Sequence, residues 1–480
     1  MNSFSIQDTT MENIQHSKRS QGGLTEMPHA TIDKTSIKLT GSEWLYCFCC
    51  LAIFVCWALF QEFNYAPDEY SRFLLPEYIY QNHSLPNGWD PAVRFAPQGI
   101  SFAFRFTFLP AIVGAAGMSI ASFFSQDPGI LLFGARCASI LFGLLAVYFS
   151  IKISKLLFKG TARWIFIVLM SLIPQFIFLC SYVNNDIACV CCSLVISYGW
   201  IRALREGWSG KNCLYLAIGV AGCLLSYYNG YAWVLLSIVF FFGICWIKKT
   251  GVAFILKRAT LSLCVVLVLA GGFVVRNAIL YDGDVLGSSS SEESGLLYAD
   301  TTIIMPDSAH ELGYSLTDVL TGQVPDYLSL SNWIKITVKS FFGTFGYMSD
   351  WLPSPIYYLY VAIFAVGIGC FTISLLTKLL TKQNIQKTTV LLYVCLLFVF
   401  AITLAIDLHF SIFTSYQPQG RYLYPALLPI VLVVSKGYDC ALSKVKNGFV
   451  RNSMTLVFCF AFFILACYVA LFHFFPNAIG

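Results

Sequence analysis

The chain has 480 residues, of which 57% are hydrophobic and only 11% are charged, and its mean hydropathy is +0.70. Soluble domains carry charge on about a quarter of their residues. A water-soluble fold could not bury this much apolar surface, so the composition excludes an ordinary soluble protein and predicts a membrane protein.

Polar and apolar segments follow one another in a simple order. Residues 1–42 are polar and predict a disordered cytoplasmic tail. A helix needs about 20 residues to cross the hydrocarbon layer, and apolar runs near that length recur along the remaining chain. We expect about eleven spanning helices, at 43–63, 134–152, 162–180, 186–204, 211–228, 231–247, 259–280, 355–377, 388–408, 422–436 and 453–475.

The apolar stretch 99–124 is treated differently because Arg105, Pro110 and a glycine-rich segment interrupt it. We expect it to lie in the outer interface rather than to span the bilayer. Counting it as a span would invert every later segment and move the basic loops outside.

The distribution of charge predicts the orientation. With the N-terminus inside, most of the 30 Lys and Arg residues fall in cytoplasmic segments, as the positive-inside rule requires. Two large segments, 64–133 and 281–352, then lie outside. The expected fold is an all-α, polytopic transmembrane bundle over residues 43–480 with amphipathic helices on its outer face. There is no nucleotide-binding glycine motif, so a donor would come from the membrane, and no nucleic-acid partner is expected.

An acidic pair follows the first span. Pro67 should end that helix at the bilayer surface, so Asp68 and Glu69 emerge at the boundary with water. Adjacent carboxylates there suit a general base or a divalent cation such as Mg²⁺ or Mn²⁺; the alternative is a solvated helix start. Asp186 opens another helix on the same face, where Asn184 or Asn185 is expected to cap the helix.

A guanidinium group stands where the positive-inside rule disfavours one. Arg421 opens the tenth predicted span from outside, and its planar fork suits phosphate or carboxylate. The alternative is snorkelling to lipid head groups. Gly420 beside it would let a ligand approach the backbone closely. Arg136 and Arg276, at the outer ends of their spans, are weaker candidates for phosphate contacts.

The segment 339–353 combines aromatic rings with glycines and Asp350. Aromatic residues at a membrane boundary usually form a belt, but sugars also stack on such rings. Both interpretations stay open for this segment.

Four motifs, in order along the chain, resemble a known group of proteins. They are PDE at 67–69, SYVNND at 181–186, SFFGTFGYM at 340–348 and QGRYLYP at 419–425. Together they resemble the GT-C superfamily of membrane glycosyltransferases, and more closely a bacterial family of polytopic proteins of unassigned function grouped near these enzymes. That family has a His where this chain has Arg72, which leaves metal dependence open.

The resemblance implies an inverting glycosyltransferase that moves a sugar from a polyprenyl-phosphate donor to a cell-envelope glycan, such as a lipid-linked O-antigen or another surface polymer. The expected location is the plasma (bacterial inner) membrane, with the active site extracytoplasmic. Alternatives are a transporter or flippase of lipid-linked saccharides and a non-catalytic envelope-assembly protein.

The resemblance also suggests roles for residues. Asp68 would be the base, with Glu69 orienting the acceptor or a cation and Asp186 supporting the acceptor side. Arg421 would neutralise the leaving phosphate with help from Arg136 or Arg276. The expected substrate contacts are Tyr65, Asn185, Tyr347, Asp350, Trp351, Gln419 and Tyr422.

Overall fold

The computed structural model describes residues 38–300 and 308–479. Most of the predicted tail, 1–42, lies outside these residues. The helices are α2 (Gly41–Phe60), α3 (Glu69–Asn82), α4 (Leu109–Ser122), α5 (Pro128–Leu157), α6 (Arg163–Ser171), α7 (Pro174–Leu179), α8 (Asp186–Glu206), α9 (Gly210–Leu224), α10 (Tyr231–Ile247), α11 (Val252–Val266), α12 (Gly272–Leu280), α13 (Ser288–Tyr298), α14 (Leu316–Thr321), α15 (Leu330–Phe342), α16 (Ser354–Leu380), α17 (Lys387–Phe413), α18 (Leu427–Ser443), α19 (Gly448–Val469) and α20 (Phe475–Ala478), and the strands are β1 (Thr344–Phe345) and β2 (Asp350–Trp351).

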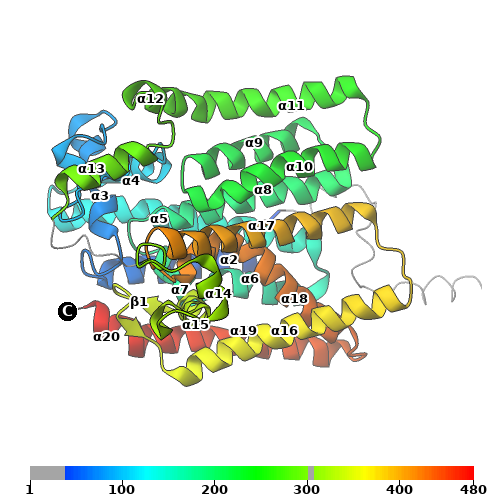
Figure 1. Ribbon diagram of the computed structural model, residues 1–480. Coiled ribbons are helices and arrows are strands. Elements are labelled where there is room, and N and C mark those ends of the chain that lie inside the picture. The colour runs from blue at the N-terminus through cyan, green and yellow to red at the C-terminus, as the bar shows by residue number, and fades with distance from the viewer. Residues whose placement is uncertain (1–37, 301–307, 480) are drawn as a thin grey trace, which may run out of the picture.

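The long helices run side by side, and the short helices α3, α4 and α13 gather at one end of the bundle (Figure 1). Within the described residues, nine helices are long and apolar enough to cross a membrane. All eleven predicted runs are helical, but 162–180 and 211–228 form helices shorter than the predicted spans. The number of spans therefore stays a prediction.

The run 162–180 is two helices instead of one. Helix α6 ends at Ser171 and α7 begins at Pro174. Proline at the first turn of a helix is tolerated, but it cannot continue a preceding helix. The break places the polar loop that follows α7 close to the end of α2, where Ser181 donates a hydrogen bond to Gln61 Oε1 over 2.9 Å.

Helix α8 is the most buried of the nine long apolar helices in the described residues, because 94% of its apolar window is buried inside the bundle, against 17% for α16. It packs on α5, α9, α10 and the 3-10 helix η7 (Gly420–Ala426). The start of α8 and η7 are therefore brought together at one end of the core, although more than 230 residues separate them.

The two predicted outer segments form small elements rather than long loops. Residues 64–133 contain α3 and α4, and α4 packs on α3 and α5. Residues 281–352 contain α13, α14, α15 and the antiparallel pair β1–β2, in which Thr344 pairs with Trp351. These elements lie over the end of the bundle at which α2 ends and α8 begins.

Glycines allow α16 and α18 to cross closely. A Cβ atom added at Gly367 would lie 2.6 Å from Val434 Cγ1 and 2.8 Å from the Val434 carbonyl oxygen, whereas nothing lies within 4 Å of one added at Gly369. In lipid, small residues at such crossings allow the van der Waals contacts that hold helices together.

We predict that Gly367→Ala lowers the stability of the bundle by about 1–3 kcal/mol, because the added methyl group meets the backbone of α18. Gly369→Ala, two residues away on α16, is the control and should leave the melting temperature unchanged. Thermal unfolding in detergent, followed with a thiol-reactive dye that reports newly exposed buried cysteines, measures both variants. Equal melting temperatures would contradict the tight crossing.

Candidate active site

The loop after α2 turns sharply before α3 begins. Asp68 has φ 63° and ψ 5°, a left-handed conformation that is uncommon outside glycine but is tolerated by Asp and Asn. Its side chain makes no capping bond to α3. Asp68 therefore occupies the N-cap position of α3 without capping the helix through its side chain, and its carboxylate is directed elsewhere.

That carboxylate meets Arg421. Asp68 Oδ2 lies 2.6 Å from Arg421 Nη2, which joins the start of α3 to η7 across 353 residues of sequence. Arg421 is 5% exposed, whereas the Asp68 side chain is 43% exposed. The pair thus combines a buried cation with a carboxylate that solvent or a ligand can reach.

The other contacts of Arg421 are long. Its Nη1 lies 3.4 Å from both the Pro67 carbonyl oxygen and the Tyr182 hydroxyl, and its Nη2 lies 3.3 Å from the Tyr422 hydroxyl. No described residue accepts from its Nε. Because charge-assisted hydrogen bonds usually measure 2.7–2.9 Å, the guanidinium group retains donor capacity for an anion.

Asp186 and Arg72 complete a four-charge cluster with this pair. Asp186 is 5% exposed and is an electrostatic neighbour of Arg421, Arg72 and Asp68; its Oδ1 has no hydrogen-bond partner among the described residues. Burial raises the pKa of Asp68, but the guanidinium groups of Arg421 and Arg72 outweigh that effect and hold this pKa below its usual value. Asp68 is therefore ionised at neutral pH.

Arg72 is a site residue for which the sequence predicted no role. Its guanidinium carbon lies 3.5 Å from the centre of the Phe102 ring and 5.9 Å from that of the Tyr227 ring. Within the part of the chain that the structure describes, this guanidinium group forms no ion pair, and the Arg72 hydrogen bond there is the one from its backbone N–H to the Asp68 carbonyl oxygen. A signal was present in the sequence. Arg72 follows Asp68 by four residues at the start of a helix, and residues with this spacing lie on the same helix face.

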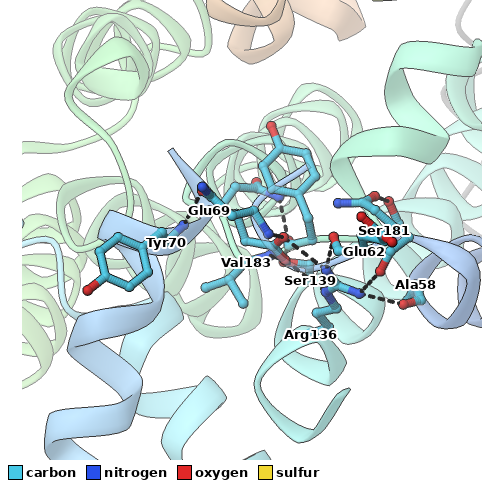
Figure 2. Close-up of polar contacts among 12 residues, drawn as sticks. Ala58, Glu62, Glu69, Tyr70, Arg136, Ser139, Ser181 and Val183 are labelled. Atoms are coloured by element: carbon cyan, nitrogen blue, oxygen red, sulfur yellow. Dashed lines mark hydrogen bonds and ion pairs between the residues drawn. The ribbon is translucent and has the colours of Figure 1, made fainter. Parts of the chain in front are cut away.

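Glu69 and Arg136 form a second, saturated pair (Figure 2). Arg136 Nε and Nη2 donate to the two oxygens of Glu69 over 2.8 and 2.9 Å, and Glu69 also accepts from the backbone of Asn64 and Val183. The remaining Arg136 donors reach the carbonyl oxygens of Ala58, Gln61 and Glu62. All five N–H groups of the guanidinium are used, so neither residue has a free bond for a substrate.

These carboxylates do not fit a divalent cation. Asp68 faces Arg421, whereas Glu69 faces Arg136 and is 0% exposed, so the two adjacent acids point into different surroundings. Within residues 38–300 and 308–479 there is no group of three His, Cys, Asp or Glu side chains that could hold a metal ion.

The hairpin formed by β1 and β2 contacts the loop between α2 and α3, which carries Asp68. Tyr65 donates to Asp350 Oδ2 over 2.5 Å, and Tyr347 donates to Asn64 Oδ1 over 2.6 Å. The Tyr347 and Trp351 side chains are 56% and 39% exposed. The candidate residues of segment 339–353 thus lie beside the loop between α2 and α3.

Other predicted residues have different surroundings. Asn185 stands at the N-cap position of α8 but makes no capping bond through its side chain. Asn184 Oδ1 instead accepts from the Ile187 backbone N–H over 3.1 Å, so Asn184 is the predicted residue whose side chain satisfies the start of this helix. Asn185 donates to the Ser226 carbonyl oxygen over 2.8 Å. Arg276 donates to the Pro86 carbonyl oxygen over 2.6 Å, and no contact in the described chain joins it to Asp68 or Arg421.

The turn that carries Arg421 is packed against α15. A Cβ atom at Gly420 would lie 2.1 Å from the Phe341 backbone nitrogen, so the prediction that Gly420 makes room for a ligand is wrong, because α15 fills that space. Beside it, Gln419 Oε1 is buried without a partner among described residues, and the Tyr422 hydroxyl donates to Gln417 Oε1 over 2.8 Å.

A family of predicted membrane proteins, DUF2142, matches residues 109–431. The chain belongs to this family. No curated protein matches the chain.

Two solved structures resemble this family member. ArnT from Cupriavidus metallidurans bound to undecaprenyl phosphate has a TM-score of 0.50 and 12% identity, with 92% of this chain and 74% of ArnT covered. The archaeal oligosaccharyltransferase AglB from Archaeoglobus fulgidus, in complex with an inhibitory peptide and a dolichol-phosphate, has a TM-score of 0.46 and 14% identity, with 92% of this chain and 56% of AglB covered. The likeness to ArnT shows a shared fold and confirms the predicted all-α fold of bundled membrane helices.

We predict that Glu69→Ala destabilises the protein by about 3–5 kcal/mol, because it leaves Arg136 as a buried charge without its carboxylate. Glu77→Ala on the same helix is the control and should change stability little. The thiol-dye melting measurement compares them. If the two variants melt alike, the Glu69–Arg136 pair does not support the site.

Proposed function

We propose that this protein is an inverting glycosyltransferase that takes a sugar from a polyprenyl-phosphate donor and transfers it to a cell-envelope glycan, such as an O-antigen or another surface polymer. The contact between Asp68 and Arg421 carries the proposal, because it places a reachable carboxylate against a buried guanidinium with unused donors. The fold shared with ArnT, which was solved with undecaprenyl phosphate, supports the class of donor.

The donor phosphate is assigned to Arg421 and Arg72. Both are cations without a fully satisfied set of acceptors, and both lie next to Asp68. A leaving phosphate gains negative charge in the transition state, and a preorganised guanidinium in a water-poor site stabilises that charge strongly. Arg136 is replaced in this role because the Glu69 carboxylate and three backbone carbonyl oxygens occupy its donors.

An apolar groove offers a place for the polyprenyl chain. The groove has a volume of about 510 Å³ and lies between α15, α16, α17 and η7–α18. Phe341 and Phe364 line it, and so does Leu423, two residues from Arg421. A lipid whose phosphate reaches Arg421 would bury part of its tail here, which is favourable for apolar surface.

Asp68 is the proposed base. The acceptor hydroxyl oxygen attacks the anomeric carbon, its proton passes to Asp68, and the bond from the anomeric carbon to the phosphate oxygen breaks with its electron pair on the phosphate. In the free protein Arg421 keeps the Asp68 pKa low, which makes the carboxylate a weak base. A donor phosphate on Arg421 would compete for that cation and raise the Asp68 pKa, so donor binding would activate the base.

The remaining roles follow from burial. Asp186 is the buried acid of the four-charge cluster and is a positioning residue for Arg421 and Arg72. Glu69 and Arg136 hold the loop between α2 and α3. Tyr65 from that loop and the hairpin residues Tyr347, Asp350 and Trp351 form the proposed sugar-facing wall. The outer segment 281–352, to which three of these wall residues belong, has the proposed role of covering the donor site and limiting the access of water to the donor.

Donor binding provides the first test. Arg421→Lys keeps the charge but loses the planar fork, and we expect it to weaken binding of undecaprenyl phosphate to the purified protein and to lower sugar transfer about 100-fold. Asp68→Asn should leave lipid binding at least as tight and lower transfer to a similar extent, because it removes the base alone. Lys446→Gln, at an exposed position, is the control for charge.

Transfer is measured by comparing envelope glycans by mass spectrometry. The parent strain, a deletion strain and deletion strains carrying each variant are compared. The proposal requires a glycan that is lost on deletion, restored by the wild-type gene and not restored by Asp68→Asn. Full restoration by Asp68→Asn would exclude it as the base, and unchanged glycans in the deletion strain would exclude the transferase.

The proposed orientation places the site outside the inner membrane. We expect Ser289→Cys on α13 to react with a membrane-impermeant thiol reagent in intact cells, and Lys446→Cys to react only after the cells are opened. The exposed serine and lysine side chains make the two positions comparable. The reverse pattern would invert the topology.

A further inference from the structure

A polar cavity lies at the end of the bundle opposite Asp68. Helix α8 begins at Asp186 beside the four-charge cluster and ends at Glu206, which lines this cavity. Twenty-one residues of helix separate the two ends by about 30 Å. The cavity has a volume of about 1060 Å³ and lies between the segment before α2 and the helices α2, α5, α8, α9 and α11.

Cations dominate the lining of this cavity. Its charged residues are Lys38, Lys152, Arg202, Lys211, Arg258 and Glu206. The single acid pairs with Arg202 over 2.8 Å, and none of the other four cations has a carboxylate partner within residues 38–300 and 308–479.

In a neighbouring cluster both cations have a carboxylate partner. Lys155 and Arg163 share the buried carboxylate of Glu43. Like charges that face one cavity repel one another, so an anion would relieve a cost that the fold otherwise carries.

Aromatic rings fix the cations on the wall. Lys152 Nζ lies 4.8 Å from the centre of the Tyr148 ring and 5.5 Å from that of Tyr198. Arg202 lies 5.7 Å from the Tyr198 ring. Ring faces attract cations without neutralising them, so the positive charge remains available to a ligand.

The start of α9 adds backbone donors to the same cavity. Ser209 caps this 15-residue helix by accepting from the Asn212 N–H, and the next residue, Gly210, has no side chain to cover the helix end. A Cβ atom there would lie 3.2 Å from Arg258 Nη1. The positive end of a helix beside an unpaired guanidinium is favourable for an anion.

We propose that this cavity binds a phosphate-bearing ligand with more than one negative charge, which is either the head group of an anionic lipid or a soluble phosphate compound. The site is separate from the proposed transfer site and does not depend on that function. Basic pockets between helix ends at a membrane surface suit phosphate groups because the helices supply several cations at fixed positions.

The test uses the purified full-length protein in a neutral detergent. The probes are dioctanoyl phosphatidic acid, dioctanoyl phosphatidylcholine and inorganic phosphate, and the measurement is the apparent Kd from a binding titration. We expect phosphatidic acid to bind, and we expect Lys152→Gln/Arg258→Gln to weaken that binding at least about tenfold, because two charge-assisted contacts are lost. Lys249→Gln/Lys446→Gln removes the same net charge at exposed positions and should change the Kd less than about twofold.

Each outcome has a consequence. Binding of phosphatidic acid without inorganic phosphate identifies a lipid head group, and binding of both identifies recognition of the phosphate group itself. Equal binding of phosphatidylcholine, equal losses in both double variants, or no binding of any phosphate probe would overturn the proposal. If the double variant does not fold, the single variants Arg258→Gln and Arg258→Lys are compared instead. Arg258→Gln should weaken binding of phosphatidic acid more than Arg258→Lys, since only Arg258→Lys keeps the cation.

Discussion

A buried ion pair at the end of the bundle fixes the geometry on which the proposed site depends. Glu69 and Arg136 are almost completely buried and bond to each other through both carboxylate oxygens. Arg136 also binds carbonyl oxygens at the end of α2, which a helix leaves without internal partners, and Glu69 accepts from the loop before α8. Three segments are therefore tied to one guanidinium–carboxylate pair, and the short loop that carries Asp68 cannot move independently of them.

Two neighbouring carboxylates consequently have different roles. Asp68 adopts a left-handed backbone conformation and directs its side chain away from α3, whereas Glu69 enters the helix and the interior. The first carboxylate is partly exposed and meets a cation with spare donors; the second is sealed by four donors. Because of this difference in burial and partners, Asp68 is available for chemistry, whereas Glu69 serves to hold the fold together.

Charges are rare in this chain, and the structure gathers them at both ends of the helices. The Asp68–Arg421 cluster combines acids with guanidinium groups, which suits a reaction in which a proton leaves one group and negative charge develops on another. The cavity beside α9 has cations with little acid, which suits binding of an anion. The balance of acids and bases in each cluster, rather than the number of charges, separates the two proposals.

The sequence by itself determined the helical membrane fold, because long apolar runs in a chain with few charges have no stable alternative to helices in lipid. It also placed Asp68, Asp186 and Arg421 among the candidates, since charges beside such runs are costly and therefore conspicuous. The break at Pro174, the partners of each acid and the unsatisfied guanidinium of Arg72 were decided only by the tertiary structure. Hydropathy and motifs describe each segment alone, whereas the availability of a charged group depends on which distant segments fill its hydrogen bonds.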